Sequence, residues 1–253
     1  MPQVSTFATV KIELDKYCVV DAGNTQIKVI DFEDDKIIQQ VAIPYHQVDK
    51  INALLQNRVT YTSILSSVVS EEKKQQLIEL LHPTLVLNEN TALPISIEDY
   101  KTQDTLGTDR IANAVAASYF AKNKSALVID VGTCIKFDLV VEGRYKGGSI
   151  SPGYKMRLRA MHEFTGALPL VDLEKIDYLV GKSTKESMLS GVLNGVQAEI
   201  SKFIDLYLAK YPGLTIFLTG GDYKLFEIEL KNSIFADNNL TVKGLYLILK
   251  HNV

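Results

Sequence analysis

Residues 19–28 read Val-Val-Asp-Ala-Gly-Asn-Thr-Gln-Ile-Lys, and residues 128–136 read Val-Ile-Asp-Val-Gly-Thr-Cys-Ile-Lys. Once one residue is dropped, both stretches have an apolar run, then Asp-x-Gly, then further residues that end in Ile-Lys. Each pattern predicts a strand, a tight turn and a second strand. Because Asp21 and Asp130 lie 109 residues apart in a chain of 253, the repeat predicts a duplicated α/β domain. We expect one half at residues 1–125, a second at 126–253, and a ligand-binding cleft between them.

The rest of the chain shows the same alternation. Short apolar runs rich in Val and Ile are separated by stretches of helical spacing, which is typical of an α/β fold. Helices are expected over residues 71–81, 108–121 and 183–209, and strands around 18–20, 64–65, 85–87, 127–129 and 216–218. The longest apolar runs have about five residues, far fewer than the ~20 that cross a bilayer. We therefore expect no membrane span.

Composition excludes several classes of protein. The chain has 27 basic and 30 acidic side chains, a net charge of −3 and a pI of about 5.9, which excludes a nucleic-acid binder built on bulk positive charge. Its 46% hydrophobic content is enough for a sizeable core. Cys18 and Cys134 are too few for a disulfide framework. These features predict a globular protein of the reducing cytoplasm, without nucleic-acid or membrane partners.

The two Asp-x-Gly turns suggest a phosphate ligand. Glycine lets backbone N–H groups approach an anion, and a neighbouring threonine offers a hydroxyl. A carboxylate beside a phosphate would repel it unless a cation lies between them, and magnesium commonly bridges the two. One such turn joins strands in many proteins. Two of them in the same register favour nucleotide binding.

Three further segments carry candidate chemistry. Gly107-Thr108-Asp109-Arg110 stands where a helix is expected to begin, so Thr108 or Asp109 would serve as a cap. Alternatively, the carboxylate would take the proton of an attacking alcohol, and the guanidinium would bind an anionic group. Residues 147–153 and 218–222 are rich in glycine and follow or surround predicted strands. No Walker-type sequence is present, which excludes a P-loop kinase.

Taken in order, these motifs closely resemble those of type III pantothenate kinases. The resemblance runs from about Tyr17 to Leu249 and rests on residues 21–25, 107–110, 130–133, 148–153 and 219–222. It implies the superfamily of acetate and sugar kinases, heat-shock ATPases and actin, with duplicated ribonuclease-H-like domains and a nucleotide cleft between them. It also implies ATP-dependent phosphorylation of pantothenate to 4'-phosphopantothenate, the first step of coenzyme A biosynthesis.

The resemblance implies a role for particular residues. Asp109 would be the catalytic base, Asp21 would hold magnesium-ATP, and Asp130 would bind a monovalent cation, potassium or ammonium. The implied pantothenate-binding residues are Tyr100, Gly107, Thr108, Asp109, Arg110 and Thr184. The implied ATP-binding residues are Asp21, Ala22, Gly23, Asn24, Thr25, Gln26, Ile27, Lys28, Thr133, Gly220 and Gly221.

The resemblance also implies a homodimer, with the pantothenate pocket near the subunit interface. Two features depart from the family pattern: residues 1–16 precede the first strand with no role that we can assign, and Cys134 stands where the family more often has Ala. A sugar or acetate kinase of the same superfamily would share both phosphate loops but lack Gly-Thr-Asp-Arg. An ATP-responsive regulatory or partner-binding module would bind ATP and ignore pantothenate.

Overall fold

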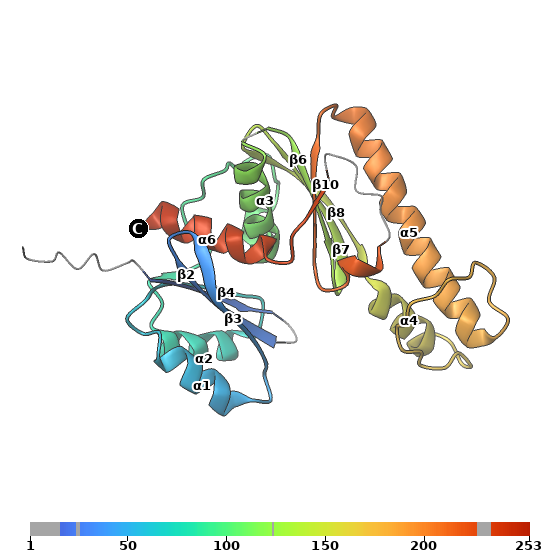
Figure 1. Ribbon diagram of the computed structural model, residues 1–253, viewed down its shortest axis with the longest axis horizontal. Coiled ribbons are helices and arrows are strands. Elements are labelled where there is room, and N and C mark those ends of the chain that lie inside the picture. The colour runs from blue at the N-terminus through green and yellow to red at the C-terminus, as the bar shows by residue number, and fades with distance from the viewer. Residues whose placement is uncertain (1–15, 24–25, 123, 227–233) are drawn as a thin grey trace, which may run out of the picture. The chain divides into compact units, whose positions relative to one another are not determined.

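The computed structural model describes residues 16–23, 26–122, 124–226 and 234–253 (Figure 1). Asn24 and Thr25 of the first predicted phosphate loop, and nearly all of the extension at residues 1–16, lie outside this part. The chain forms two compact units, Met1–Leu87 and Asn88–Val253.

The first unit is a five-stranded mixed sheet with two helices on one face. Its elements are β1 (Tyr17–Ala22), β2 (Gln26–Glu33), β3 (Lys36–Pro44), α1 (Val48–Gln56), β4 (Thr62–Ser67), α2 (Glu71–Leu81) and β5 (Leu85–Val86). The strand order is β3-β2-β1-β4-β5, with β1–β2 and β2–β3 antiparallel and β1–β4 and β4–β5 parallel. Helices α1 and α2 lie on one face of this sheet (Figure 1). Their buried leucines pack on the inward side chains of β1 and β2.

The second unit repeats this sheet. Its elements are η1 (Gln103–Thr105), α3 (Thr108–Phe120), β6 (Ala126–Val131), β7 (Cys134–Val141), β8 (Arg144–Pro152), α4 (Tyr154–Glu163), α5 (Thr184–Lys210), β9 (Thr215–Thr219), η2 (Tyr223–Leu225), β10 (Ile234–Ala236) and α6 (Leu240–Asn252). The order is β10-β9-β6-β7-β8, and every pair has the same direction as its counterpart in the first sheet. This identity of topology confirms the predicted fold class of duplicated ribonuclease-H-like domains.

The three predicted helices form as α2, α3 and α5, within one residue of the expected ends. The start of α5 shows why: the Ser183 hydroxyl accepts a hydrogen bond from the Glu186 backbone N–H at 3.2 Å, and the Glu186 carboxylate accepts one from the Lys182 backbone at 2.6 Å. This is a reciprocal arrangement close to a capping box. The cap is Ser183, and Thr184 is the first helical residue.

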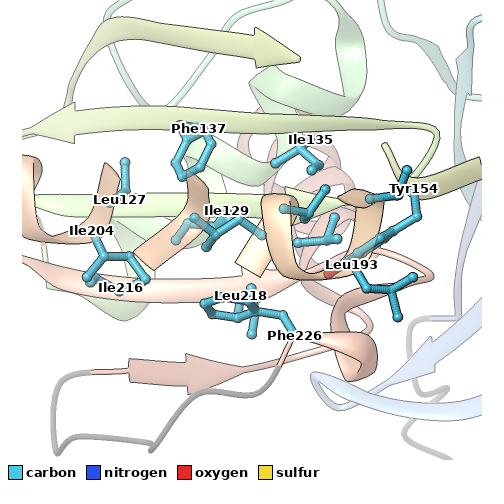
Figure 2. Packing of buried hydrophobic residues seen from close by; sticks show 14 of the residues in the cluster. Leu127, Ile129, Ile135, Phe137, Tyr154, Leu193, Ile204, Ile216, Leu218 and Phe226 are labelled. Atoms are coloured by element: carbon cyan, nitrogen blue, oxygen red, sulfur yellow. The ribbon is translucent and has the colours of Figure 1, made fainter. Parts of the chain in front are cut away.

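The period of two along β6 and β7 sorts their side chains between two cores. Leu127 and Ile129 of β6, together with Phe137 of β7, face the long helix α5, as Figure 2 shows. On the opposite face, Ala126 and Val128 pack with residues of α3 and α6. The same alternation turns three charged side chains toward this opposite face, those of Asp130, Lys136 and Asp138. The face that α3 covers therefore carries charged groups.

Helix α3 explains where the compact units divide. It packs side by side with α6 and contacts β6 and β7 (Figure 1), so it belongs to the second compact unit although it follows β5 in the chain. In topological order α3 follows β5 as α6 follows β10. The division into halves at residues 125 and 126 follows from the repeated hairpins and not from packing. It stays a prediction, as does the cleft between the halves.

Candidate active site

The first turn of α3 lies against the β6–β7 hairpin through a lysine that sequence reasoning left without a role. The Lys136 Nζ donates to the Asp109 Oδ2 at 2.5 Å and to the Asp130 Oδ2 at 2.9 Å. Asp109 also accepts a hydrogen bond on its Oδ1 from the Arg110 backbone N–H at 2.8 Å. One ammonium therefore joins the predicted base to the predicted cation ligand.

The register of the hairpin places Asp130 and Lys136 together. They are direct cross-strand partners on β6 and β7, as Asp21 and Lys28 are on β1 and β2. Neighbouring opposite charges on one face of a sheet attract. The repeat of Lys28 at Lys136 was the signal that could have identified this residue.

Lys136 is held charged by its neighbours. Its side chain is 18% exposed, against 12% for Asp130 and 31% for Asp109. Burial disfavours the ammonium, but the Asp130 and Asp109 carboxylates outweigh that cost and raise the pKa of Lys136 above its usual value. The site thus carries a fixed cation at neutral pH.

Arg110 turns away from Asp109 into a buried cluster. Its Nε donates to the Asp138 Oδ1 at 2.9 Å, and its Nη2 forms an ion pair with the same oxygen at 2.7 Å. The Tyr145 hydroxyl also donates to this oxygen, at 2.7 Å. The Tyr100 hydroxyl lies 3.4 Å from the Arg110 Nη1. Burial raises the pKa of Asp138, and the charge of Arg110 opposes that rise. The guanidinium is mainly a partner of Asp138, and its remaining N–H groups are what it could offer a substrate.

Two glycines keep this cluster compact. Gly147 has φ +91°, a conformation that favours glycine, and a Cβ there would lie 3.5 Å from the Tyr100 ring. At Gly107 a Cβ would come 2.8 Å from the Asp109 Oδ1. Thr108 follows as the first residue of α3. The structure therefore gathers five of the six predicted pantothenate residues at or next to the start of α3.

The sixth, Thr184, is exposed at the start of α5. Within the part of the chain that the structure describes, neither a hydrogen bond nor an ion pair joins it to Asp109 or Arg110.

The second phosphate loop and the glycine pair after β9 converge beside Asp130. The Asp222 backbone N–H donates to the Val131 carbonyl at 2.9 Å. Gly220 has φ +100°, and a Cβ there would come 2.5 Å from the Asp130 Oδ1. Thr133 is exposed at the turn between β6 and β7. Three predicted ATP-binding residues, Thr133, Gly220 and Gly221, thus belong to two adjoining loops.

The first phosphate loop lies in the other compact unit. The Gly23 backbone N–H donates to the Gln26 carbonyl at 3.2 Å, and the Tyr45 hydroxyl donates to the Gly23 carbonyl at 2.9 Å. Burial, helped by the Asp21 charge, raises the pKa of Tyr45 to about 12. Ala22 and Ile27 are fully buried, so only their backbone atoms could meet a ligand.

The described residues contain no group of three His, Cys, Asp or Glu side chains arranged to hold a metal ion. In the same part of the chain, no helix is long and apolar enough to cross a membrane.

Comparisons with known proteins agree on one family. A family model described as type III pantothenate kinase matches residues 17–206. A relative with that name from Bacteroides fragilis (strain YCH46) is 41% identical over 237 residues, covering 92% of this chain and 97% of the relative. A relative of the same name from Cytophaga hutchinsonii is 42% identical over 236 residues, covering 93% and 99%.

Solved structures share the fold at low identity. A Campylobacter jejuni protein assigned to the Baf family of transcriptional activators gives a TM-score of 0.58 at 19% identity, covering 93% of this chain and 98% of that one. The inorganic polyphosphate/ATP-glucomannokinase of an Arthrobacter strain gives 0.52 at 14% identity, covering 94% and 100%. MreB5 of Spiroplasma citri bound to ADP gives 0.51 at 11% identity, covering 94% and 97%. At these identities the likeness concerns the fold alone.

Proposed function

The chain belongs to the type III pantothenate kinase family, and from that membership we propose that it transfers the ATP γ-phosphoryl group to the primary hydroxyl of pantothenate, with Asp109 as the base. This reaction opens coenzyme A biosynthesis. The observation that supports the base assignment is the way Asp109 is held. Both of its oxygens accept a hydrogen bond, yet its side chain stays 31% exposed.

The chemistry requires a carboxylate that is oriented and still reachable. Asp109 takes the hydroxyl proton while the alcohol oxygen forms a bond to the γ-phosphorus, and the bond from that phosphorus to the bridging oxygen breaks to release ADP. The first turn of α3 favours a negative charge at Asp109. Lys136 and the Arg110 backbone N–H fix the side chain, which reduces the cost of reaching a reactive geometry.

The resemblance to the family supports an ATP site that draws on the two Asp-x-Gly turns and the Gly220–Gly221 loop. We propose that Asp21, Gly23, Gln26 and Lys28 of the first turn bind the phosphates through side chains and backbone N–H groups, with Asp21 toward magnesium. Ala22 and Ile27 would contribute backbone atoms only, because their side chains are buried. Magnesium, when bound with ATP, would neutralise charge that builds on the phosphates. Thr133 and the glycine loop would meet the nucleotide from the second unit's sheet.

The monovalent cation implied at Asp130 fits the site poorly. The Asp130 Oδ2 already accepts a hydrogen bond from the Lys136 ammonium at 2.9 Å. Potassium or free ammonium at the same oxygen would place two positive charges side by side. The proposed reaction therefore proceeds without such an ion.

We propose that Tyr100, the Gly107–Arg110 segment and Thr184 bind pantothenate. Arg110 is buried against Asp138, so only its N–H groups beyond those donated to Asp138 and Tyr100 would meet the substrate carboxylate. The homodimer and a cytoplasmic location remain proposals, supported by the family resemblance and by the reaction's use of ATP. Light scattering coupled to size exclusion tests the dimer, and a mass of about one chain would contradict it.

The decisive experiment is ADP release from magnesium-ATP with and without pantothenate, using Asp109→Asn beside the unchanged protein. The matched control is Asp104→Asn, the same change at an exposed residue of η1. Loss of a general base typically costs ~10²- to 10⁴-fold in kcat. We expect that loss for Asp109→Asn with nearly unchanged KM values, and near-normal turnover for the control.

Two results would overturn the proposal in different ways. Near-normal turnover of Asp109→Asn would remove the base assignment and leave the activity. If pantothenate failed to stimulate ADP release from the unchanged protein, the activity itself would be refuted. Stimulation by glucose or N-acetylmannosamine would then indicate the sugar-kinase alternative.

A further inference from the structure

Lys136 lies at the point where two carboxylates would otherwise need a separate cation between them. Asp109 and Asp130 come from different elements, the first turn of α3 and the end of β6, and both turn a carboxylate oxygen toward the same point. Two carboxylates that share a point repel each other unless a cation lies between them. Lys136 places its ammonium there.

The geometry is that of a built site rather than a surface ion pair. Lys136 is mostly buried, and its Nζ lies 2.5 Å from one carboxylate and 2.9 Å from the other. Exposed pairs contribute little because water screens them and both side chains lose entropy. Lys136 lies within β7, and the flanking Ile135 and Phe137 are buried on the opposite face of the sheet. The strand therefore fixes the backbone that carries the ammonium, and no free ion has to be ordered.

We propose that the Lys136 ammonium is a tethered monovalent cation, which positions Asp109 and neutralises Asp130, so that turnover requires no inorganic monovalent cation. This inference rests on the proposed kinase reaction. It assigns Lys136 as a positioning residue, because its Nζ contacts the base and not the reacting atoms. An ion free in solution would have to compete with a cation whose local concentration is set by the fold.

The groups around Lys136 limit what else could supply the charge. The Asp109 and Asp130 carboxylates are its ion-pair partners among the described residues. The Arg110 guanidinium is bound to Asp138 instead. Removing Lys136 therefore leaves Asp109 and Asp130 facing a vacant point that potassium and water can fill.

The test compares the unchanged protein with Lys136→Ala, Lys136→Gln and a control, Lys202→Ala, which changes an exposed lysine of α5. ADP release is measured with magnesium-ATP and pantothenate in potassium, ammonium, sodium and tetramethylammonium chloride at equal ionic strength. We expect the unchanged protein and the control to vary less than about twofold among the salts, since a change of that size is well below the energy of one charged hydrogen bond. Lys136→Ala should lose about tenfold or more in sodium, the size of a lost charged hydrogen bond, and recover in potassium or ammonium. Lys136→Gln, which keeps the bulk, should lose activity without recovering.

A second readout does not depend on turnover. The melting temperature of the unchanged protein should be equal in potassium and sodium chloride, whereas potassium should specifically stabilise Lys136→Ala by binding the folded state. A requirement of the unchanged protein for potassium, in turnover or in melting, would overturn the inference, and so would full activity of Lys136→Ala in sodium. If pantothenate stimulates ADP release in no salt, the kinase proposal fails, and the melting comparison still decides whether Lys136 fills a cation site.

Discussion

Replacing Arg110 by Met should destabilise the fold more at pH 8 than at pH 5. Asp138 is fully buried, and its Oδ1 accepts hydrogen bonds from the Arg110 Nε and the Tyr145 hydroxyl and forms an ion pair with the Arg110 Nη2. In the part of the chain that the structure describes, its Oδ2 has no hydrogen-bond partner. Arg110→Met removes the balancing charge and leaves the carboxylate with Tyr145 alone.

The magnitude follows from that geometry. Breaking a buried pair by removing one partner costs about 3–5 kcal/mol, because the other charge stays buried without compensation. The lost hydrogen bond to a charged group, at ~1.5–3 kcal/mol, together with the lost ion pair gives the same order. For a protein of this length each kcal/mol lowers Tm by ~2–4 °C, so we expect a loss of about 10 °C.

The pH dependence has a definite sign. Burial raises the pKa of Asp138 even beside Arg110, and without Arg110 this pKa rises further. The folded variant then holds a proton over a range above ~4 where the unfolded chain, with its ordinary aspartate pKa, has lost it. Stability therefore falls as pH rises through that range. The deficit should be smaller at pH 5, where the variant can protonate Asp138.

The assay is urea denaturation of the variant and the unchanged protein at both pH values, followed by circular dichroism. Arg110→Met/Asp138→Asn should recover most of the lost stability, because no buried charge remains. The matched control is Arg144→Met, which breaks an exposed pair with Asp99, and should change the midpoint little. A loss below ~1 kcal/mol for Arg110→Met, or an equal loss at both pH values, would refute the reasoning.

Two further changes test the packing that positions the site. A Cβ at Gly244 of α6 would overlap the backbone of Ala112 in α3, so Gly244→Ala should push the two helices apart. We expect a loss of about 1–3 kcal/mol in thermal denaturation and slower turnover, because α3 carries the proposed base. An unchanged Tm would contradict this contact. Gly195 is exposed within α5, and a Cβ there would meet no atom within 4 Å. Gly195→Ala should therefore stabilise the protein by about 0.5–1 kcal/mol in the same assay, because alanine favours a helix over glycine. A loss of stability would show that this helix face is occupied.

Much of the fold was predictable because its signals are local. The repeated Asp-x-Gly hairpins led to two sheets of identical order, and helices α2, α3 and α5 form where their apolar spacing and end residues predict. Residues 108–110 begin α3 as expected, with Gly107 at its N-cap, while the role of residues 107–110 in binding and catalysis stays a prediction. Helices α1, α4 and α6 were not predicted.

The site was only partly predictable. Lys136 had been seen as part of the repeat, yet its contact with Asp109 joins residues 27 positions apart. Arg110 was expected to face the substrate, and its engagement with Asp138 depends on how α3 lies on β7. Neither contact has a local pattern in the chain.

The amino-acid sequence alone determined the hairpin repeat, the alternation that sends Asp130, Lys136 and Asp138 to one face of a sheet, and the start of α3 at Thr108. These follow from turn chemistry, the period of two and helix capping, all of which act over a few residues. Only the tertiary structure decided that α3 covers that face, because packing joins segments far apart in the chain. That packing places one ammonium between two carboxylates and so determines which charge holds Asp109, the proposed base.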